Sequence, residues 1–379
     1  MNKRPLKLTL FFTYDYSLKT WKDAGLFKRD MLLYEKLAEK GVETTFITYG
    51  AEDEKSLVAG NRAFTVGNKP EWMSSKVYRS LVWLIHAGRL RSCQVIKTHQ
   101  VQGAIAGVLA SKIWRKPLLA RCGYLKSVFA QLEGESEEQR RAYEREEQLA
   151  FRHARLVCVP SQAEAEYAAG QYGLPLDKFR ICPNWIDTEL FSPFARSHQK
   201  FTIIYLARFV EKKAPLDFLK AIVGIDDIRV IMIGRGPQLD EVKAFVAKHR
   251  LPVETLEGMA NELLPQYFNQ GDLYVLPTHH EGGSPKTLLE AMSCALPVIS
   301  TDGFGVNEVF SDGVEGKKVK FGDVEGLREA ILWMREHPDE AKEMGKRGRQ
   351  RVIEHYSIEK ALERELLILE ELTGEKMRA

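Results

Sequence analysis

The chain has 379 residues, enough for two domains that each bury a core. Its apolar fraction of 44% and charged fraction of 28% are typical of a soluble globular enzyme, and a net charge of +3 is too small to indicate nucleic-acid binding. The five cysteines include no C-x-x-C pair and no apolar run reaches the length of a membrane span, so we expect a cytoplasmic protein with free thiols.

The N-terminal part predicts strands that alternate with helices. The basic residues and apolar run at the N-terminus could form a secretory signal, but the run is short, Asp15 interrupts it and no cleavage site follows, so we predict a first strand at residues 6–13. A helix at 26–39 and a strand at 44–48 follow Gly25. This order is that of a Rossmann-type unit, although the G-x-G-x-x-G fingerprint is missing.

Residues 76–91 (KVYRSLVWLIHAGRLR) combine large apolar residues with basic residues on both flanks. One interpretation is a helix that lies on an anionic membrane surface, which would make a peripheral contact with the cytoplasmic face of the membrane. The other, which we favour, is a helix packed on the sheet of the first domain with its basic ends in water. Both interpretations stay open at this stage.

Polar residues follow two further strands of this first domain. A strand at 94–98 ends at His99, and a strand at 117–120 is followed by Arg121 and, two residues on, Tyr124. Ligands of an open α/β sheet bind beyond the carboxyl ends of its strands, so these three side chains are candidate ligand contacts. A structural role is the alternative, because isolated histidines are usually structural.

A second series of strands and helices begins after the polar stretch 196–200, which we predict to be the linker between domains. The exit loops of its first two strands carry candidate residues: Arg208 and Lys213 after the strand at 201–206, and Gly234 and Gly236 after the strand at 229–233. Two cations at the ligand edge of a parallel sheet could neutralise a diphosphate. The alternative is a solvated basic loop.

The stretch LYVLPTHHEGGSPKTLLEAMSCALPVISTDGFGVNE, residues 273–308, is predicted to be a βαβ unit with parallel strands. Its parts are a strand at 273–276, a polar turn from His279 to Ser284, a helix opened by Pro285, a strand at 298–301, and a further helix after Gly303 and Gly305. Glycines in the turn let a ligand approach the backbone, and the start of a helix is an anion site.

Glu290 lies one turn inside the first helix of this unit, flanked by Leu288, Leu289, Ala291 and Met292. A carboxylate in apolar surroundings is costly unless polar groups meet it, and a ribose diol could donate two hydrogen bonds to it. The alternative is a glutamate that points outward from a surface helix.

The segment HHEGGSPKTLLEAMSCALPVISTDGFGVNE resembles the donor-binding segment of the GT-B glycosyltransferases, in particular the retaining family 4 group. That group has two glutamates separated by seven residues, then Ala-Met, a Pro-Val strand and a Gly-Gly…Glu turn. Here eight residues separate Glu281 and Glu290, so strict register places Gly282 at the first glutamate, and Phe304-Gly305 replaces the Gly-Gly pair. Two other departures are Cys122, at the place of a family histidine, and Trp185, at the place of a junction glycine.

The resemblance implies an α/β GT-B fold, with two Rossmann-like doubly wound domains facing a central cleft. The expected division is an N-terminal acceptor-side domain at 1–195, a nucleotide-sugar donor domain at 196–356, and a helix at 357–379 that crosses back to the first domain. In the tail, Leu362, Leu366, Leu369 and Leu372 follow one side of an amphipathic helix.

The resemblance also implies the function: transfer of a sugar from a nucleotide-sugar to a hydroxyl of a glycan, lipid or small molecule, with retention of configuration. Because the sequence has no D-x-D pair, we expect no metal and no cofactor, with two cations in place of the metal. The implied catalytic residues are Arg208, Lys213 and Glu281; the donor-binding residues are Glu290, Gly283, Ser284, Pro285, Lys286, Thr287, Gly234, Gly236 and Gly25; the acceptor-side residues are His99, Arg121 and Tyr124.

Two other classes of function stay open. One is a glycosyl phosphorylase or sugar-nucleotide epimerase on the same scaffold; we find no clear phosphate or pyridoxal site for a phosphorylase. The other is a non-catalytic sugar-nucleotide sensor, because Gly282 and Cys122 stand where site residues are expected. Transfer or hydrolysis of the donor by the purified protein would separate these classes.

Overall fold

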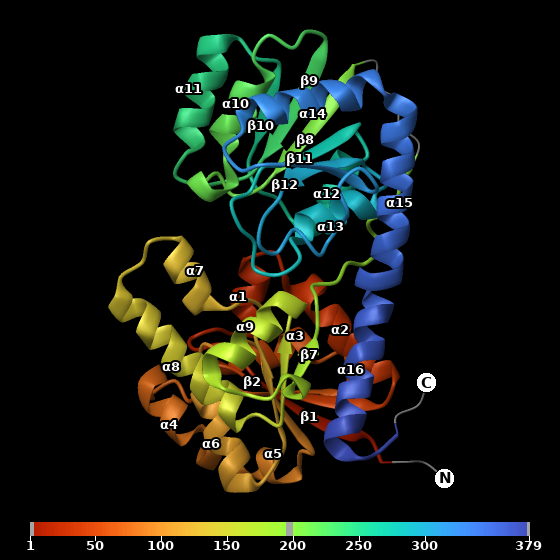
Figure 1. Cartoon of the computed structure of the whole chain (residues 1–379). Coiled ribbons are helices and arrows are strands. Elements are labelled where there is room, and N and C mark those ends of the chain that lie inside the picture. The colour runs from red at the N-terminus through yellow and green to blue at the C-terminus, as the bar shows by residue number, and fades with distance from the viewer. Residues whose placement is uncertain (1–3, 195–199, 377–379) are drawn as a thin grey trace. The chain divides into compact units, whose positions relative to one another are not determined.

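The computed structural model describes residues 4–194 and 200–376, which fold into two compact units (Figure 1). Unit 1 consists of Met1–Cys182 and Ala361–Ala379, and unit 2 of Pro183–Lys360. The division therefore falls before Pro183 and not at 195/196, because Ile186 and Phe191 are buried in the core of unit 2. Apart from Lys200, the predicted linker at 196–200 lies outside the described residues.

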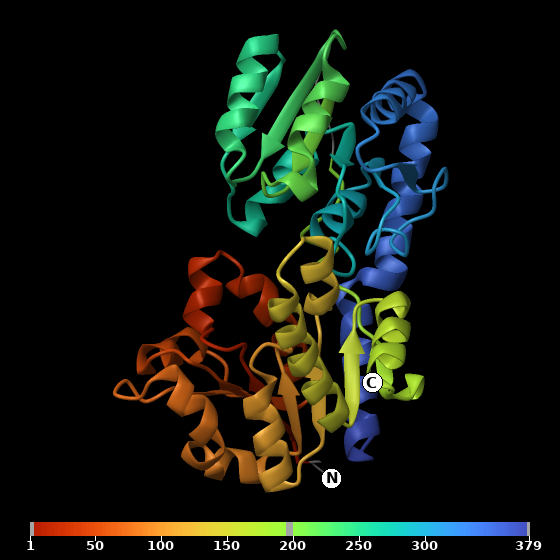
Figure 2. The ribbon, with the colours of Figure 1, turned by 60° about the vertical axis from the view of Figure 1, so that its left-hand side comes forward.

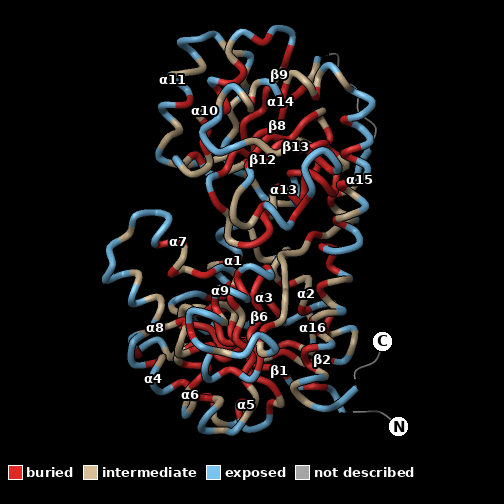
Figure 3. Tube along the Cα trace, in the orientation of Figure 1, coloured by how far each residue is buried: buried red, intermediate tan, exposed pale blue. Residues whose placement is uncertain are grey.

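Unit 1 is built on a parallel sheet with the strand order β3-β2-β1-β4-β5-β6-β7. Its strands are β1 (Leu6–Phe11), β2 (Val42–Ile47), β3 (Phe64–Gly67), β4 (Val95–Thr98), β5 (Leu118–Arg121), β6 (Leu156–Val159) and β7 (Phe179–Ile181). The strands are largely buried, as in parallel sheets that helices cover on both faces (Figure 3). The strand order reverses between β1 and β4, the position where doubly wound sheets form a ligand crevice.

The helices of unit 1 are α1 (Leu18–Asp23), α2 (Phe27–Glu39), α3 (Lys55–Val58), α4 (Ser75–Ile85), α5 (Ala87–Ser92), α6 (Ala104–Trp114), α7 (Lys126–Leu132), α8 (Glu137–His153) and α9 (Gln162–Tyr172). Several of them differ from expectation. Helix α1 was not predicted, and it precedes Gly25. The helix predicted at 76–91 is two helices, α4 and α5, which meet at His86.

The last helix, α16 (Ile358–Thr373), packs on the sheet of unit 1, as predicted for the C-terminal helix. Leu369 is buried in the same core as strand β1, and Leu362, Leu366 and Leu372 pack beside it. The helix runs beside β7 (Figures 1 and 2), where Arg180 pairs with Glu371.

Unit 2 contains a second parallel sheet, with the order β10-β9-β8-β11-β12-β13. Its strands are β8 (Phe201–Leu206), β9 (Ile228–Ile233), β10 (Val253–Leu256), β11 (Leu273–Leu276), β12 (Val298–Thr301) and β13 (Gly316–Val319). Its helices are α10 (Pro215–Ile222), α11 (Leu239–His249), α12 (Leu264–Phe268), α13 (Lys286–Ser293), α14 (Val324–Glu336) and α15 (Pro338–Tyr356). Here the order reverses between β8 and β11. Two Rossmann-like units of this kind confirm the predicted fold class.

The βαβ unit predicted around α13 is present. Strands β11 and β12 have the predicted bounds and pair in parallel, with Tyr274 opposite Val298. Pro285 is the N-cap of α13 rather than its first helical residue. The helix predicted after Gly305 is wrong: residues 304–309 form turns. Helix α15 contacts their backbone, since Arg351 Nε donates to Val309 O.

Candidate functional site

The predicted catalytic residues gather at the point where the strand order of unit 2 reverses. Strand β8 ends at Leu206, and Arg208 follows before a short 3-10 helix, Glu211–Lys213, that leads into α10. The neighbouring strand β11 leads into the loop that carries Glu281. Because the carboxyl ends of parallel neighbours meet at one edge, two chain segments far apart in sequence converge here.

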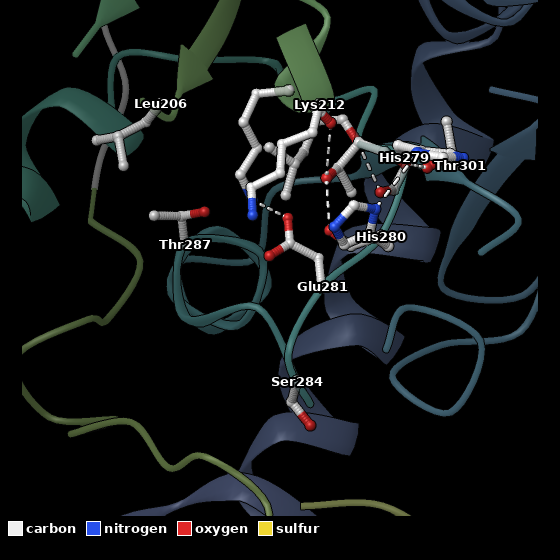
Figure 4. Close-up of polar contacts among 12 residues, drawn as sticks. Leu206, Lys212, His279, His280, Glu281, Ser284, Thr287 and Thr301 are labelled. Atoms are coloured by element: carbon white, nitrogen blue, oxygen red, sulfur yellow. Dashed lines mark hydrogen bonds and ion pairs between the residues drawn. The ribbon is translucent and has the colours of Figure 1, made fainter. Parts of the chain in front are cut away.

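Lys213 and Glu281 form an ion pair across these two loops (Figure 4). Each side chain is only 12% exposed. Burial lowers the pKa of the Lys213 ammonium, opposed by the charge of Glu281 and reinforced by Lys212 and Arg208. Arg208 itself is exposed. The site therefore holds one buried, paired cation and one cation open to solvent.

This pairing decides how the loop that carries Glu281 is built. A Glu281 side chain directed to solvent is excluded, since its carboxylate is buried against Lys213. The extra residue of the loop needs one left-handed glycine, Gly283 with φ +68°, and not a pair, because Gly282 has no positive φ. The Glu281 N–H donates to Phe304 O at 2.9 Å. A Cβ on Gly305 would collide with Glu281 O, so the turn after β12 packs directly against the loop that carries Glu281.

Two buried tyrosines that the sequence analysis did not single out hold the strand ends together. The Tyr205 hydroxyl donates to Lys213 O at 2.9 Å. The Tyr274 hydroxyl lies 2.8 Å from Thr287 Oγ1 and 3.1 Å from Leu206 O. Tyr274 thus links the end of β8 to the first turn of α13. Both tyrosines lie inside apolar strands, so the sequence gives no signal of this role.

The start of α13 is tied to the segment that follows Pro183. Ser284 is buried, and its carbonyl accepts a hydrogen bond from Asn184 Nδ2 at 2.8 Å. The Lys286 ammonium lies 5.2 Å from the centre of the Trp185 ring. Figure 4 shows Glu281 directed toward the side of the site where Thr287 lies. Asn184 and Trp185 are therefore part of the surroundings of the site; the resemblance to a family junction was the signal that could have found them.

Glu290 points into the protein and not outward. Its residue is 2% exposed, and Asn261 Nδ2 donates to Glu290 Oε1 at 2.8 Å. The alternative of an exposed surface glutamate is therefore excluded. Burial raises the pKa of the Tyr274 hydroxyl, and the charges of Glu281 and Glu290 add to this rise. Asn261 comes from the connection between β10 and α12 and was not predicted.

Gly234 and Gly236, predicted to bind the donor, have a structural reason to be glycine. A Cβ on Gly234 would collide with Ala207 O, and one on Gly236, at φ +157°, would collide with Phe209 O. The Phe209 N–H donates to Arg235 O at 2.8 Å. The loop after β9 therefore packs directly on the loop that carries Arg208 and keeps it in place.

A second junction connects the β8 exit loop to the residues that precede Glu281. The His279 N–H and the Thr278 hydroxyl both donate to Lys212 O, at 2.8 and 3.2 Å, and the Thr301 hydroxyl donates to Thr278 O (Figure 4). His280 is buried, and its Nδ1 lies 3.3 Å from His279 Nδ1. These bonds leave the loops of β8, β11 and β12 little freedom to move independently.

The candidates in unit 1 lie at the reversal of its own sheet. His99 Nδ1 is 3.1 Å from Thr13 Oγ1, and Arg121 Nη1 donates to His99 O at 3.3 Å. Tyr124 is exposed and packs edge-on against Phe129. The structure thus joins His99 and Arg121, from neighbouring strands. Gly25 has φ +68°, but its N–H donates to Lys22 O at the end of α1 and is not open to a diphosphate.

Two features are absent from residues 4–194 and 200–376. No three His, Cys, Asp or Glu side chains are grouped so that they could hold a metal ion. No helix in this part of the chain is both long enough and apolar enough to span a bilayer.

Comparison with known proteins gives two consecutive family matches. Residues 31–190 match the family described as Glycosyltransferase Family 4, and residues 187–351 match Glycosyl transferases group 1. Among curated proteins, D-inositol 3-phosphate glycosyltransferase of Paenarthrobacter aurescens is 28% identical over 58% of the chain and 59% of its own length, which is less than two thirds. The amylovoran biosynthesis glycosyltransferase AmsK of Erwinia amylovora is 24% identical over 83% of the chain and 74% of its own length.

Solved structures share the fold over nearly the whole chain. Sucrose-phosphate synthase of Thermosynechococcus elongatus superposes with a TM-score of 0.79 at 18% identity, covering 97% of this chain and 99% of that one. The Anabaena protein HepE in complex with UDP-glucose gives 0.75 at 17% identity, covering 98% and 100%. With both family matches and this fold, the chain belongs to the GT-B glycosyltransferases of group 1.

Proposed function

We propose that the protein transfers a hexosyl unit from a nucleotide-sugar to an acceptor hydroxyl, with retention of anomeric configuration. The observation that carries this proposal is the convergence of Arg208, Lys213 and Glu281 at the reversal of the unit 2 sheet. The family match supports the reaction class. A UDP-sugar is the favoured donor, because the similar HepE protein was solved with UDP-glucose.

The chemical task of this site is to accept the charge that develops on a departing nucleoside diphosphate. Arg208 is exposed, so its guanidinium can meet phosphate oxygens directly. Lys213 supplies a second positive charge, and Glu281 holds it in place. The first turn of α13 adds backbone N–H groups that have no partner within the helix. Cations fixed in advance near a leaving group stabilise the transition state at little reorganisation cost.

The remaining donor contacts follow from this placement. We assign the ribose hydroxyls to Glu290, a buried carboxylate that already accepts from Asn261. We assign the sugar to Glu281 and to the Gly283–Thr287 segment. With two cations in the role of a Lewis acid, the proposed reaction needs neither a metal ion nor a cofactor. The acceptor would bind at unit 1, where His99 and Arg121 lie; a glycan, a lipid and a small molecule are all compatible with these groups.

The test is turnover of UDP-sugars by the purified protein, followed by the anomeric configuration of the product. We expect Arg208→Ala to lower kcat/KM about 10²- to 10³-fold, the usual effect of removing one such charge. Arg229→Ala is the matched control, because Arg229 is near the start of β9, at the opposite end of the same sheet, and pairs with Glu254. Activity in excess chelator is expected to persist.

Three outcomes would contradict the proposal. Equal loss in both arginine variants would show that Arg208 has no special role. Conversion of the donor sugar to its epimer without an acceptor would indicate an epimerase. Tight donor binding without any transfer or hydrolysis across acceptor classes would indicate a sensor.

A further inference from the structure

Helix α4 in unit 1 is apolar on two adjacent faces, one buried and one exposed. One face is buried: Tyr78 and Val82 lie in the core, and the Tyr78 hydroxyl is 2.8 Å from His86 Nε2. The other face carries an exposed stripe, Val77, Leu81 and Leu84, spaced so that all three lie on one side of the helix. A helix that only covers its own sheet needs one apolar face, so packing within unit 1 does not explain the stripe.

Trp72, two residues before the N-cap of α4, adds a further exposed apolar side chain to this part of the chain. It is 83% exposed, the most exposed of the large apolar side chains in the part of the chain that the structure describes. Ile113, near the end of α6, is exposed as well, and α6 is joined to α4 by a hydrogen bond from Trp114 Nε1 to Trp83 O at 3.0 Å. We call this set, Trp72, Val77, Leu81, Leu84 and Ile113, the α4 surface (compare the exposed segments in Figure 3).

The charge around the α4 surface is mainly positive. The stretch from Trp72 to Leu132 contains ten lysines and arginines and no aspartate or glutamate, in a chain whose total charge is +3. Lys76, Arg89 and Arg91 are exposed on α4 and α5, and so are Lys112 and Arg115 beside Ile113.

Three carboxylates near the α4 surface are exceptions to this positive charge. Asp15 accepts a hydrogen bond from Ser75 Oγ at 2.6 Å. Burial raises the pKa of Glu146 on α8, and the positive charge of Arg79 opposes this rise. Arg79 also lies over the Tyr14 ring, so we do not count it among the free charges. Glu71 is exposed next to Trp72. Two exposed acids, Asp15 and Glu71, among five exposed bases leave the neighbourhood of the stripe positive.

We propose that the α4 surface docks on an anionic lipid bilayer, with its apolar side chains in the headgroup–acyl boundary and its basic side chains on lipid phosphates. Charge complementarity favours lipid, and exposed tryptophan beside an apolar stripe is the composition of an interfacial helix. An acidic protein partner would use the same charges but would not need a protruding stripe of leucines. The proposal concerns unit 1 alone and does not depend on the activity proposed for unit 2.

The experiment is co-sedimentation of the full chain with vesicles of phosphatidylcholine, with and without phosphatidylglycerol. We expect binding only when the anionic lipid is present, with a blue shift of tryptophan fluorescence that Trp72→Phe reduces. Arg89→Gln with Arg91→Gln is expected to weaken binding about fivefold for each charge, and high salt to weaken it further. Arg141→Gln, an exposed arginine of α8, is the control for charge.

The sharpest comparison is between two leucines of equal exposure. Leu84 on α4 and Leu367 on α16 are both 57% exposed. Leu84→Ser is expected to weaken partitioning by about fivefold to tenfold, while Leu367→Ser leaves it unchanged. Because both changes affect exposed side chains, both variants should fold, and circular dichroism checks this.

Several results would overturn the proposal. Equal binding to neutral and anionic vesicles would remove the role of charge. Equal effects of Leu84→Ser and Leu367→Ser would show that the stripe does not enter the bilayer. Displacement of the chain from vesicles by polyglutamate, with Leu84→Ser binding polyglutamate normally, would point to an acidic polypeptide as the partner.

Discussion

At the scale of single residues, the ion pair of Lys213 and Glu281 combines a structural and a chemical role. Both side chains are buried, so removal of either partner leaves a charge without its counterion in a poorly solvated place. The sequence alone predicts Lys213 and Glu281 as separate contacts to the donor. The structure shows that a change in one alters the state of the other.

The first prediction separates these roles. Lys213→Met is expected to cost about 3 kcal/mol of unfolding free energy, because Glu281 loses its partner, and to lower turnover about 10²-fold or more. The double variant Lys213→Met with Glu281→Leu should regain most of the stability and none of the turnover. Urea unfolding and donor turnover are the two measurements. Recovery of turnover in the double variant would argue against the catalytic assignment of Lys213.

The second prediction concerns Glu290. If its carboxylate accepts the ribose hydroxyls, Glu290→Gln should weaken nucleotide binding about tenfold, since a hydrogen bond to a charged group contributes about 1.5–3 kcal/mol. Calorimetry with UDP and 2′-deoxy-UDP is the measurement. The native protein should discriminate between them, and the variant should nearly lose this discrimination. An undiminished preference in the variant would leave Glu290 with a structural role alone. Glu257→Gln, an exposed glutamate, is the control.

At the scale of elements, the site depends on loops that pack on other loops. Gly234 and Gly236 admit the loop after β8, and Gly305 admits the loop that carries Glu281. Gly305 has φ +80°, and a Cβ there would also approach Gly283 O to 2.7 Å. Glycines of this kind set the position of functional side chains that they do not touch.

The third prediction compares two glycines with nearly the same backbone. Gly305→Ala should strain the backbone and also displace the loop around Glu281, which lowers turnover about tenfold or more. Gly322 has φ +79° and nothing within 4 Å of its added Cβ, so Gly322→Ala should introduce the strain alone, about 1–2 kcal/mol, with normal turnover. Thermal unfolding and kinetics of both variants provide the test. Matching kinetic losses would mean that the loop is not held by this contact.

At the scale of the whole molecule, the chain leaves unit 1 before Pro183 and returns to it at Ala361. The returning helix α16 is fastened by leucines on its apolar side and by a buried ion pair between Lys97 of β4 and Glu365, at 2.5 Å. Burial acts to lower the pKa of Lys97, but the charge of Glu365, joined by Tyr34, raises it above its ordinary value. Lys97 is therefore a charged residue in the centre of a sheet.

The fourth prediction tests this link. Lys97→Met and Glu365→Leu are each expected to cost about 3–5 kcal/mol, because each leaves one buried charge unpaired. The double variant should cost far less than the sum, since two apolar side chains can replace a buried pair at little net cost. Chemical denaturation with a double-mutant cycle measures the coupling. Strict additivity would show that the two charges do not stabilise each other.

The sequence by itself determined the local elements and the identity of the candidate residues. Strands at 201–206, 273–276 and 298–301 have the predicted bounds, because a buried strand is a short apolar run that turn residues end. The resemblance to a family located Arg208, Lys213 and Glu281 as candidates before any geometry was known.

The tertiary structure decided what these residues contact. Lys213 and Glu281 are 68 residues apart in sequence and meet only because β8 and β11 are neighbours in the sheet. Strand order depends on pairing between distant segments, which no local periodicity records. The same reason explains Asn261 beside Glu290, the contacts of α15 with the turns at 304–309, and the junction at Pro183. Local patterns decide which elements form, and packing between distant segments decides which side chains share a site.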